Sequence, residues 1–120
     1  MRQTILVVDD EIGIRLLLED LLEADGYKVY TAENGKEALE MIGTHPIDLM
    51  MIDYKLPIID GIEVIKQLEK DKKELMIMLM SGLAENLPDE IYKIPNIKKV
   101  LSKPFDVMEV RKYINELLAD

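Results

Sequence analysis

The chain alternates short runs of apolar residues with longer stretches in which apolar residues recur every three or four positions. Short apolar runs rich in β-branched residues are typical of strands covered on both faces, and the longer spacing is typical of amphipathic helices. The runs that predict strands cover residues 5–8, 27–31, 49–52, 75–80 and 100–101. Helical spacing follows each run, over residues 12–24, 36–42, 61–68, 88–92 and 107–118.

This pattern predicts an α/β fold with five helices. Strand–helix units repeated five times imply a parallel sheet with helices on both faces, because each helix carries the chain back to the start of the next strand. Right-handed crossovers leave few topologies, and among them a doubly wound, flavodoxin-like five-stranded sheet of order 2-1-3-4-5 is favoured. No repeat, linker or low-complexity segment interrupts the pattern, so residues 1–120 are expected to form one domain.

The composition excludes several classes of function. The chain has 120 residues, of which 15 are basic and 24 acidic, with a formal charge of −9 and no cysteine. The lack of cysteine excludes disulfides, cysteine-ligated metal centres and cysteine nucleophiles. The excess of negative charge repels phosphate backbones and anionic lipid, so neither nucleic acid nor a membrane surface is expected as a partner.

No segment has the character of a membrane span or a secretory signal. None of the apolar runs approaches the ~20 residues that cross a bilayer. The first residues lack the long apolar region and the small-residue cleavage site of a signal peptide. We therefore expect a cytoplasmic protein.

Polar residues stand where four of the predicted strands end. Asp9 and Asp10 follow the first strand, Asp53 ends the third, Ser81 ends the fourth and Lys103 follows the fifth. Since the carboxyl ends of parallel strands share one edge of the sheet, these side chains are expected to converge there. Three converging carboxylates repel one another unless positive charge lies between them. Lys103 supplies one charge, and Mg²⁺, which favours a few carboxylates together with water and phosphate oxygens, is the natural second.

Phosphoryl transfer makes use of this whole set of side chains. A carboxylate can attack phosphorus and become an aspartyl phosphate, and catalysis then needs in-line positioning and neutralisation of the charge on the transferring group. Mg²⁺ can bridge the carboxylates and one phosphoryl oxygen, while the Lys103 ammonium and the Ser81 hydroxyl take the other two. Gly82, next to Ser81, leaves room for the phosphoryl group.

Over its whole length the chain resembles the receiver (CheY-like) domains of response regulators in two-component signalling. Each shared motif is short, but all of them occur in the family's order and at the predicted strand ends. The motifs are Val8-Asp9-Asp10-Glu11, Gly26-Tyr27, Ala32-Glu33-Asn34-Gly35-Lys36-Glu37-Ala38-Leu39, Asp48-Leu49 with Ile52-Asp53, Leu56-Pro57 with Asp60-Gly61, Ser81-Gly82 and Lys103-Pro104-Phe105.

The resemblance implies a phosphorylation reaction at this site. Asp53 is the expected phosphoacceptor, assisted by Ser81 and Lys103, and the donor is a phosphohistidine on a sensor histidine kinase or a histidine phosphotransferase. A cis peptide bond between Lys103 and Pro104 is implied as well. Such a receiver takes part only in its own phosphorylation and dephosphorylation, so we do not expect an enzyme, and we expect a monomer.

The resemblance also implies the metal ligands. Asp10, Asp53 and the backbone carbonyl of Lys55 are expected to bind Mg²⁺ directly, and Asp9 is expected to bind it through water. Mn²⁺ is expected to substitute for Mg²⁺.

Two departures from the family pattern bear on the output. Receivers that drive an output domain usually carry Tyr or Phe three residues before the strand-5 lysine, where this chain has Val100, and Gly-Ala where it has Pro95-Asn96. Both departures bear on the usual output surface and neither touches the phosphorylation site. A stand-alone phosphorelay intermediate or docking switch is favoured, because the missing aromatic residue, Lys55 after the expected phosphoacceptor and the segment Gly13-Ile14-Arg15 resemble the single-domain intermediate of sporulation phosphorelays. A chemotaxis-type receiver, or a receiver cut from a larger DNA-binding regulator, are the alternatives within the family.

Other classes of protein share the expected strand order. A flavodoxin-like mononucleotide binder would need Gly, Ser or Thr donors after the first strand to hold a phosphate, whereas Asp9-Asp10-Glu11 places carboxylates there. An interaction module that is never phosphorylated is disfavoured, because the acids, the hydroxyl and the lysine are all present.

The predicted first helix has a wider apolar face than packing on a sheet requires. At 100° per residue, the apolar positions span about 160°, against ~100° for an ordinary buried stripe. Leu18 and Leu22 are the expected core pair, and the excess residues are expected to face solvent as a docking surface for the phosphodonor. These docking residues are Ile14, Leu17 and Leu21. In the alternative orientation they are buried, and Ile12 and Leu16 are exposed.

Overall fold

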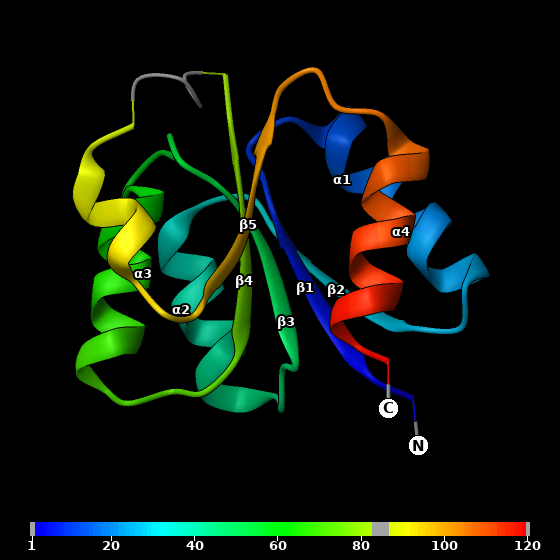
Figure 1. Ribbon diagram of the computed structural model, residues 1–120. Helices are drawn as coiled ribbons and strands as arrows, with labels where there is room; N and C mark the ends of the chain where they lie inside the picture. The colour runs from blue at the N-terminus through cyan, green and yellow to red at the C-terminus, as the bar shows by residue number, and fades with distance from the viewer. Residues whose placement is uncertain (1, 83–86, 120) are drawn as a thin grey trace.

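Five parallel strands form a sheet in the order β2-β1-β3-β4-β5 (Figure 1). The computed structural model describes residues 2–82 and 87–119. The strands are β1 (Thr4–Val8), β2 (Lys28–Ala32), β3 (Leu49–Asp53), β4 (Met76–Ser81) and β5 (Ile97–Ser102). Every neighbouring pair is parallel, so the predicted topology is confirmed.

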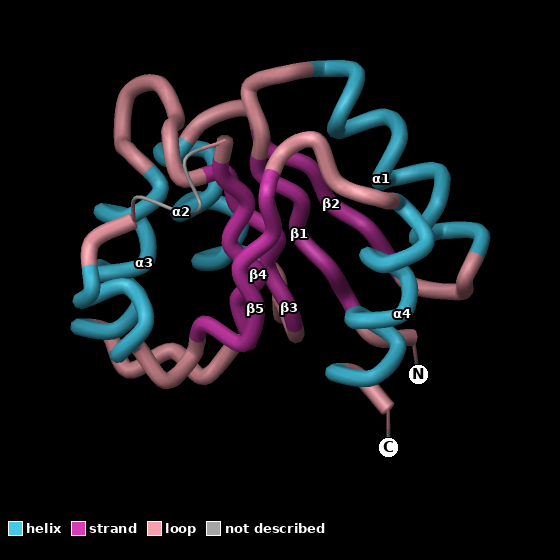
Figure 2. The backbone as a smooth tube through the Cα atoms, turned by 45° about the horizontal axis from the view of Figure 1, so that its top comes forward, coloured by secondary structure: helices cyan, strands magenta, loops and turns pink. Residues whose placement is uncertain are grey.

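Helices cover both faces of this sheet. On one face lie α1 (Ile12–Ala24) and α4 (Val107–Leu117), and on the other lie α2 (Gly35–Thr44) and α3 (Gly61–Lys70). Figure 2 shows the two helical layers with the strands between them. The helices α1, α2 and α3 each follow a strand and carry the chain back to the start of the next strand. Because all neighbouring strands are parallel, the carboxyl ends of the five strands lie at one edge of the sheet.

Apart from a polar residue at one end of each, the central strands β1, β3 and β4 are apolar because both of their faces are covered. Along β1, Leu6 and Val8 belong to the core beneath α2 and α3, whereas Ile5 and Val7 belong to the core beneath α1 and α4. The residues of β3 and β4 alternate in the same way, as the twofold period of a strand requires. The Met residues of these strands fill the two cores, where their flexible side chains adapt to irregular gaps.

The prediction of five α-helices was wrong. The described residues contain four, and the segment expected to form another is a short 3-10 helix, η2 (Asp89–Lys93). Pro88 precedes it and Pro95 follows two residues after its end, and a residue before proline is disfavoured in a helix. Ile94 is accordingly extended, with φ −81° and ψ 115°. The segment is too short for a regular helix, and the tighter 3-10 form is the one used in such short pieces.

The last strand is longer than its apolar core suggests. It covers Ile97–Ser102, whereas the sequence pattern predicted only residues 100–101. This strand lies at the edge of the sheet, and its Lys98 side chain is exposed. It therefore lacks the continuous apolar run of a strand that is covered on both faces. None of the described helices has both the length and the apolar character needed to cross a membrane.

Candidate functional site

The predicted polar residues converge at the carboxyl edge of the sheet. Asp53 is the last residue of β3 and Ser81 the last of β4, while Asp9 and Asp10 follow β1 and Lys103 follows β5. The register of the sheet places the strand ends side by side. Val8 pairs with Ile52, Asp53 pairs with Met80, and Ser81 pairs with Ser102. Parallel pairing in this register therefore gathers residues that lie up to 94 positions apart in the chain.

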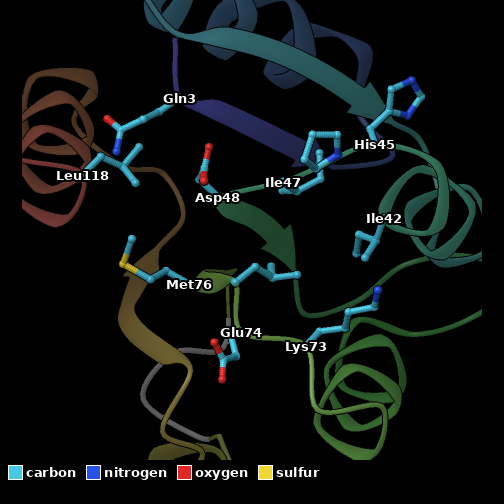
Figure 3. Close-up of a pocket in the computed structure, with 11 residues that line it drawn as sticks. Gln3, Ile42, His45, Ile47, Asp48, Lys73, Glu74, Met76 and Leu118 are labelled. Atoms are coloured by element: carbon cyan, nitrogen blue, oxygen red, sulfur yellow. The ribbon is translucent and has the colours of Figure 1, made fainter. Parts of the chain in front are cut away.

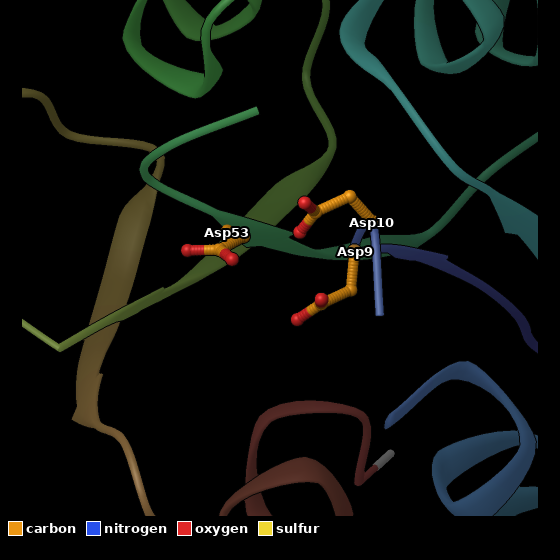
Figure 4. A group of neighbouring side chains, drawn as sticks. All are labelled: Asp9, Asp10 and Asp53. Carbon is orange, nitrogen blue, oxygen red and sulfur yellow. The ribbon is translucent and has the colours of Figure 1, made fainter. Parts of the chain in front are cut away.

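Three carboxylates form the centre of the site (Figure 4). Asp9, Asp10 and Asp53 each offer one oxygen, and these oxygens all lie within 4.8 Å of one another. Asp9 is fully buried, Asp53 is almost fully buried and Asp10 is exposed. Several carboxylate oxygens around one point, with one side open to water, form the donor set that Mg²⁺ prefers, so these residues fit that cation.

Lys103 binds two of the three carboxylates. Its Nζ lies 2.6 Å from Asp9 Oδ2 and 2.9 Å from Asp53 Oδ2. Burial lowers the Lys103 pKa, but the hydrogen bonds and the negative charges of Asp9 and Asp53 together outweigh it, so the pKa is raised and the ammonium stays charged. One ammonium against three carboxylates leaves an excess of negative charge at the site.

Burial and the neighbouring charges both affect the ionisation of the central carboxylate, Asp53. Burial raises the pKa of Asp53 above its ordinary value, and the negative charge of Asp9 raises it further. The hydrogen bond and the charge of Lys103 act in the opposite direction without cancelling the effect. A second cation at this edge would therefore stabilise the ionised form of Asp53.

Every polar group of Asp9 forms a hydrogen bond. Its N–H donates to the Ala32 carbonyl at 3.1 Å, and its Oδ1 accepts the Glu11 N–H at 2.9 Å. Its carbonyl oxygen accepts a hydrogen bond of 2.7 Å from Nη1 of Arg15 on α1. The sequence pattern did not point to Arg15 as part of the site. The only available signal was a single cationic residue on an otherwise apolar turn, one turn after the acidic pair.

The loop after Asp53 is fixed by backbone contacts. The Lys55 N–H points to Asp53 Oδ1 at 3.4 Å, and Asp60 Oδ1 accepts the N–H groups of Leu56 and Gly61 at 3.1 and 2.9 Å. A Cβ at Gly61 would overlap the Asp53 carbonyl oxygen, so glycine is needed for the loop to close. The Lys55 side chain is exposed, and the metal-binding role of its carbonyl stays a prediction.

Ser81 and Lys103 lie at the ends of two neighbouring strands, Ser81 as the last residue of β4 and Lys103 directly after β5. Ser81 is buried at the end of β4, and its carbonyl accepts the Lys103 N–H at 3.0 Å. The Lys103–Pro104 peptide bond is cis, as the resemblance implied. Beside Ser81, no atom of the described residues other than Gly82 and its chain neighbours lies within 4 Å of the place where a Cβ on Gly82 would be.

The burial of the α1 residues agrees in part with each of the two predicted orientations of the helix. Leu18 and Leu22 are fully buried, as expected for the core pair, and Leu17 is 45% exposed. Ile14 and Leu21 are half-buried against the core beneath α1 and α4.

Two further apolar residues of α1 also face solvent. Ile12 is 64% and Leu16 is 52% exposed, the two residues that the alternative orientation placed outside. The apolar face of α1 is therefore wider than its contact with the sheet, and its exposed part begins next to the acidic site.

A mostly apolar groove joins α1 to the acidic site. It has a volume of about 460 Å³. The residues that line it are Glu11, Ile14, Leu17, Lys103, Pro104 and Phe105. A partner that fills this groove would touch both the lysine of the site and the exposed apolar residues of the helix.

Another hollow, of about 430 Å³, lies at the opposite edge of the sheet (Figure 3). Its lining includes Gln3, Asp48 and Met76, near the amino ends of three strands, and none of the predicted site residues. The Asp48 carboxylate accepts the Thr4 N–H at 2.8 Å, so its role is to hold the start of β1. The carboxyl edge of the sheet is therefore the candidate site.

The sequence was compared with known protein families and curated proteins. The family model "Response regulator receiver domain" matches residues 5–115. The Bacillus subtilis protein "Sporulation initiation phosphotransferase F" is 32% identical over 118 residues, which cover 98% of this chain and 95% of that protein. The "Alkaline phosphatase synthesis transcriptional regulatory protein PhoP" of the same species is 38% identical over 118 residues. The match covers 98% of this chain but spans only about half of PhoP, 49% of its length.

Solved structures give the same result. The response regulator TrrA of Thermotoga maritima, crystallised in complex with Mg²⁺-BeF, superimposes with a TM-score of 0.85 at 35% identity. The superposition covers 97% of this chain and 99% of TrrA. The chemotaxis response regulator CheY4 of Vibrio cholerae superimposes with a TM-score of 0.84 at 28% identity, over 98% of this chain and 100% of CheY4.

Proposed function

Because the chain belongs to the response regulator receiver family, we propose that it accepts a phosphoryl group from phosphohistidine on Asp53 in a reaction that needs Mg²⁺. One observation carries this proposal. The Asp53 carboxylate stands at the end of the central strand β3, within 4.8 Å of the Asp9 and Asp10 oxygens and 2.9 Å from the Lys103 ammonium. A nucleophile, a metal-binding cluster and a fixed cation thus meet at one point.

The residues have separate tasks in the transfer. An Asp53 oxygen attacks phosphorus and forms a new P–O bond, while the P–N bond to the donor breaks and the imidazole keeps the electron pair. Lys103, already in place beside Asp53, would balance the charge on one phosphoryl oxygen, and the Ser81 hydroxyl would donate to another. Mg²⁺ bound by the carboxylates, for which Mn²⁺ would substitute, would neutralise further charge on the transferring group.

The proposed role is that of a phosphorelay intermediate. Receiver domains work with histidine kinases or histidine phosphotransferases and are not classical enzymes. The match to almost the full length of sporulation initiation phosphotransferase F supports a stand-alone intermediate. The match to half of PhoP supports the alternative, a receiver joined to an output domain. The length of the reading frame in the source genome distinguishes the two.

The fold and the site argue against the mononucleotide binder. A phosphate held at the start of α1 would meet the carboxylates of Asp9 and Asp10 rather than N–H donors alone. Family membership favours phosphorylation instead. A purified protein without flavin absorbance would agree with this conclusion.

The donor is proposed to dock on α1. The groove beside Lys103 and the exposed Leu17 form a continuous surface with Ile14, and Leu21 continues it along the helix. A helical donor domain could lay an apolar face on this surface while its phosphohistidine reaches Asp53.

The acceptor assignment is tested by mass. Incubation with a small acyl phosphate and Mg²⁺ should add one phosphoryl group to the intact wild-type protein and none to Asp53→Asn. Asp20→Asn, which changes an exposed carboxyl on α1, is the matched control and should be labelled like the wild type. Labelling of Asp53→Asn at another residue would overturn the assignment.

A further inference from the structure

Arg15 connects α1 to the backbone of the acidic pair. Its Nη1 donates to the Asp9 carbonyl oxygen at 2.7 Å, and its Nη2 lies 3.8 Å from Glu33 Oε2 in the loop after β2. Only 15% of the Arg15 side chain is exposed. The guanidinium is therefore held between two loops at the carboxyl edge, and among the described residues it forms no hydrogen bond or ion pair with a carboxylate of the metal-binding cluster.

The hydrogen bond acts on a rigid unit of the backbone. The Asp9 carbonyl and the Asp10 N–H belong to one planar peptide group, so fixing the oxygen fixes the orientation of the whole plane. That plane includes the Asp10 Cα, so together with the φ angle of Asp10 it sets the direction in which the Asp10 side chain leaves the backbone.

Asp10 depends on this plane more than its neighbours do. The Asp9 carboxylate is held by the Glu11 N–H and by Lys103, and Asp53 is held by Lys103. Among the described residues, no group donates a hydrogen bond to the Asp10 carboxylate, which is exposed. Its place within 4.8 Å of the Asp9 and Asp53 oxygens therefore rests on the backbone that carries it.

We propose that Arg15 is a positioning residue for the metal site, whose guanidinium orients the Asp9–Asp10 peptide so that Asp10 faces Asp53. This inference rests on the proposed function in one respect, the binding of Mg²⁺ by the acidic cluster. Arg15 acts through the backbone of the ligands and touches neither the metal nor the phosphoryl group.

The sign of the effect separates positioning from charge. Arg15 is a cation near a cation site, so by charge alone its removal would strengthen Mg²⁺ binding. Positioning has the opposite consequence, because a ligand released from its orientation binds the metal less well. Groups that orient metal ligands typically contribute about 10- to 100-fold to metal affinity.

The experiment measures metal affinity directly. Binding of Mn²⁺ is followed by the electron paramagnetic resonance signal of the free ion, and Mg²⁺ affinity is obtained by competition, without any phosphodonor. Arg15→Ala should weaken both affinities by about tenfold. Arg15→Lys keeps the charge but not the planar fork, and its affinities should fall between those of Arg15→Ala and the wild type.

Two control variants isolate the contact to the Asp9 carbonyl. Glu33→Gln removes the ion pair of Arg15 but leaves that contact, and should change metal affinity by less than about twofold. Arg111→Ala removes an ion pair with Asp25, at the far end of α1, and should leave metal affinity unchanged.

Each outcome decides one question. An Arg15→Ala protein that binds Mg²⁺ as tightly as the wild type, or more tightly, overturns the positioning role. If Arg15→Ala does not fold, Arg15→Lys decides, and unchanged affinity in that variant overturns the role. A wild-type protein that binds neither ion refutes the metal site of the proposed function, which is a different failure.

Discussion

Lys103 shows how a single side chain can hold two buried carboxylates in place. Its ammonium bridges the buried Asp9 and Asp53 carboxylates at 2.6 and 2.9 Å. The position of Lys103 at a strand end was predictable, because parallel strands bring their carboxyl ends together. The bridge was not, because it depends on side-chain conformations that no spacing in the sequence specifies.

Replacing Lys103 by alanine should separate metal binding from phosphoryl acceptance. Removal of a cation between two carboxylates should leave Mg²⁺ affinity unchanged or raise it. The rate of Asp53 phosphorylation by an acyl phosphate should fall by about tenfold or more, since a charge-assisted hydrogen bond contributes ~1.5–3 kcal/mol. Metal titration and the time course of intact mass measure the two effects.

Lys98→Ala serves as the control for this prediction. Lys98 lies on the same strand β5 and is exposed, so its replacement should change neither quantity. Normal acceptance and normal partner response in Lys103→Ala would contradict the role of the lysine.

At the scale of the element, α2 contains two glycines in opposite situations. Gly35, the first residue of α2, is buried, and a Cβ there would overlap the Ile59 carbonyl of the loop between β3 and α3. Gly43, near the other end of the same helix, has nothing within 4 Å of the place where a Cβ would be. The first contact holds the helix against the loop that follows Asp53, whereas the second position is free of packing constraints.

Alanine at these two positions should therefore have opposite effects on stability. Gly35→Ala should destabilise the protein by about 1–3 kcal/mol through overpacking against the backbone. Gly43→Ala should stabilise it by about 0.5–1 kcal/mol, because alanine is the better helix former. The free energy of unfolding in urea measures both. Equal effects of the two substitutions would show that the close approach at Gly35 is not needed.

The helix α1 has two groups of apolar residues in different surroundings. Leu17 is 45% exposed beside the groove that reaches Lys103, while Leu18 is fully buried against the sheet. Leu17→Ala should slow phosphotransfer from a phosphorylated histidine kinase of the source organism. It should leave labelling by acyl phosphate and the melting temperature nearly unchanged.

Leu18→Ala is the contrasting variant. It should cost about 2–5 kcal/mol of stability, as core truncations do. If Leu17→Ala instead loses stability on that scale, or transfers phosphoryl groups at the wild-type rate, the docking surface is placed wrongly.

At the scale of the whole molecule, the pattern of apolar residues was sufficient to predict the topology. Alternating strand and helix patterns leave few arrangements, and the apolar runs of the central strands indicate that both faces of the sheet are covered. The pattern of apolar residues did not predict the element correctly in two places, because prolines or an exposed charged residue interrupt it there. Prolines on both sides of η2 replaced the expected helix with a 3-10 turn, and the exposed lysine of β5 concealed the length of an edge strand.

The site was predictable to the extent that strand ends determine it. Asp9, Asp10, Asp53, Ser81 and Lys103 all lie where the predicted sheet brings them. The contact of Arg15 with the Asp9 backbone was not predictable, because it joins a side chain to a carbonyl that carries no sequence signal. The exposure of α1 was predicted only in part, since a wide apolar arc does not specify how far the helix is rotated.

The proposed function depends most on the link between the metal-binding cluster and the nucleophile Asp53. The most direct test incubates the wild-type protein with an acyl phosphate, in Mg²⁺ or in EDTA, and maps the modified peptide by mass spectrometry. The structure predicts one phosphoryl group on Asp53 in Mg²⁺ and none in EDTA, because the buried carboxylates repel an anion unless a cation is bound. Equal labelling in EDTA, or a phosphoryl group on any residue other than Asp53, would contradict it.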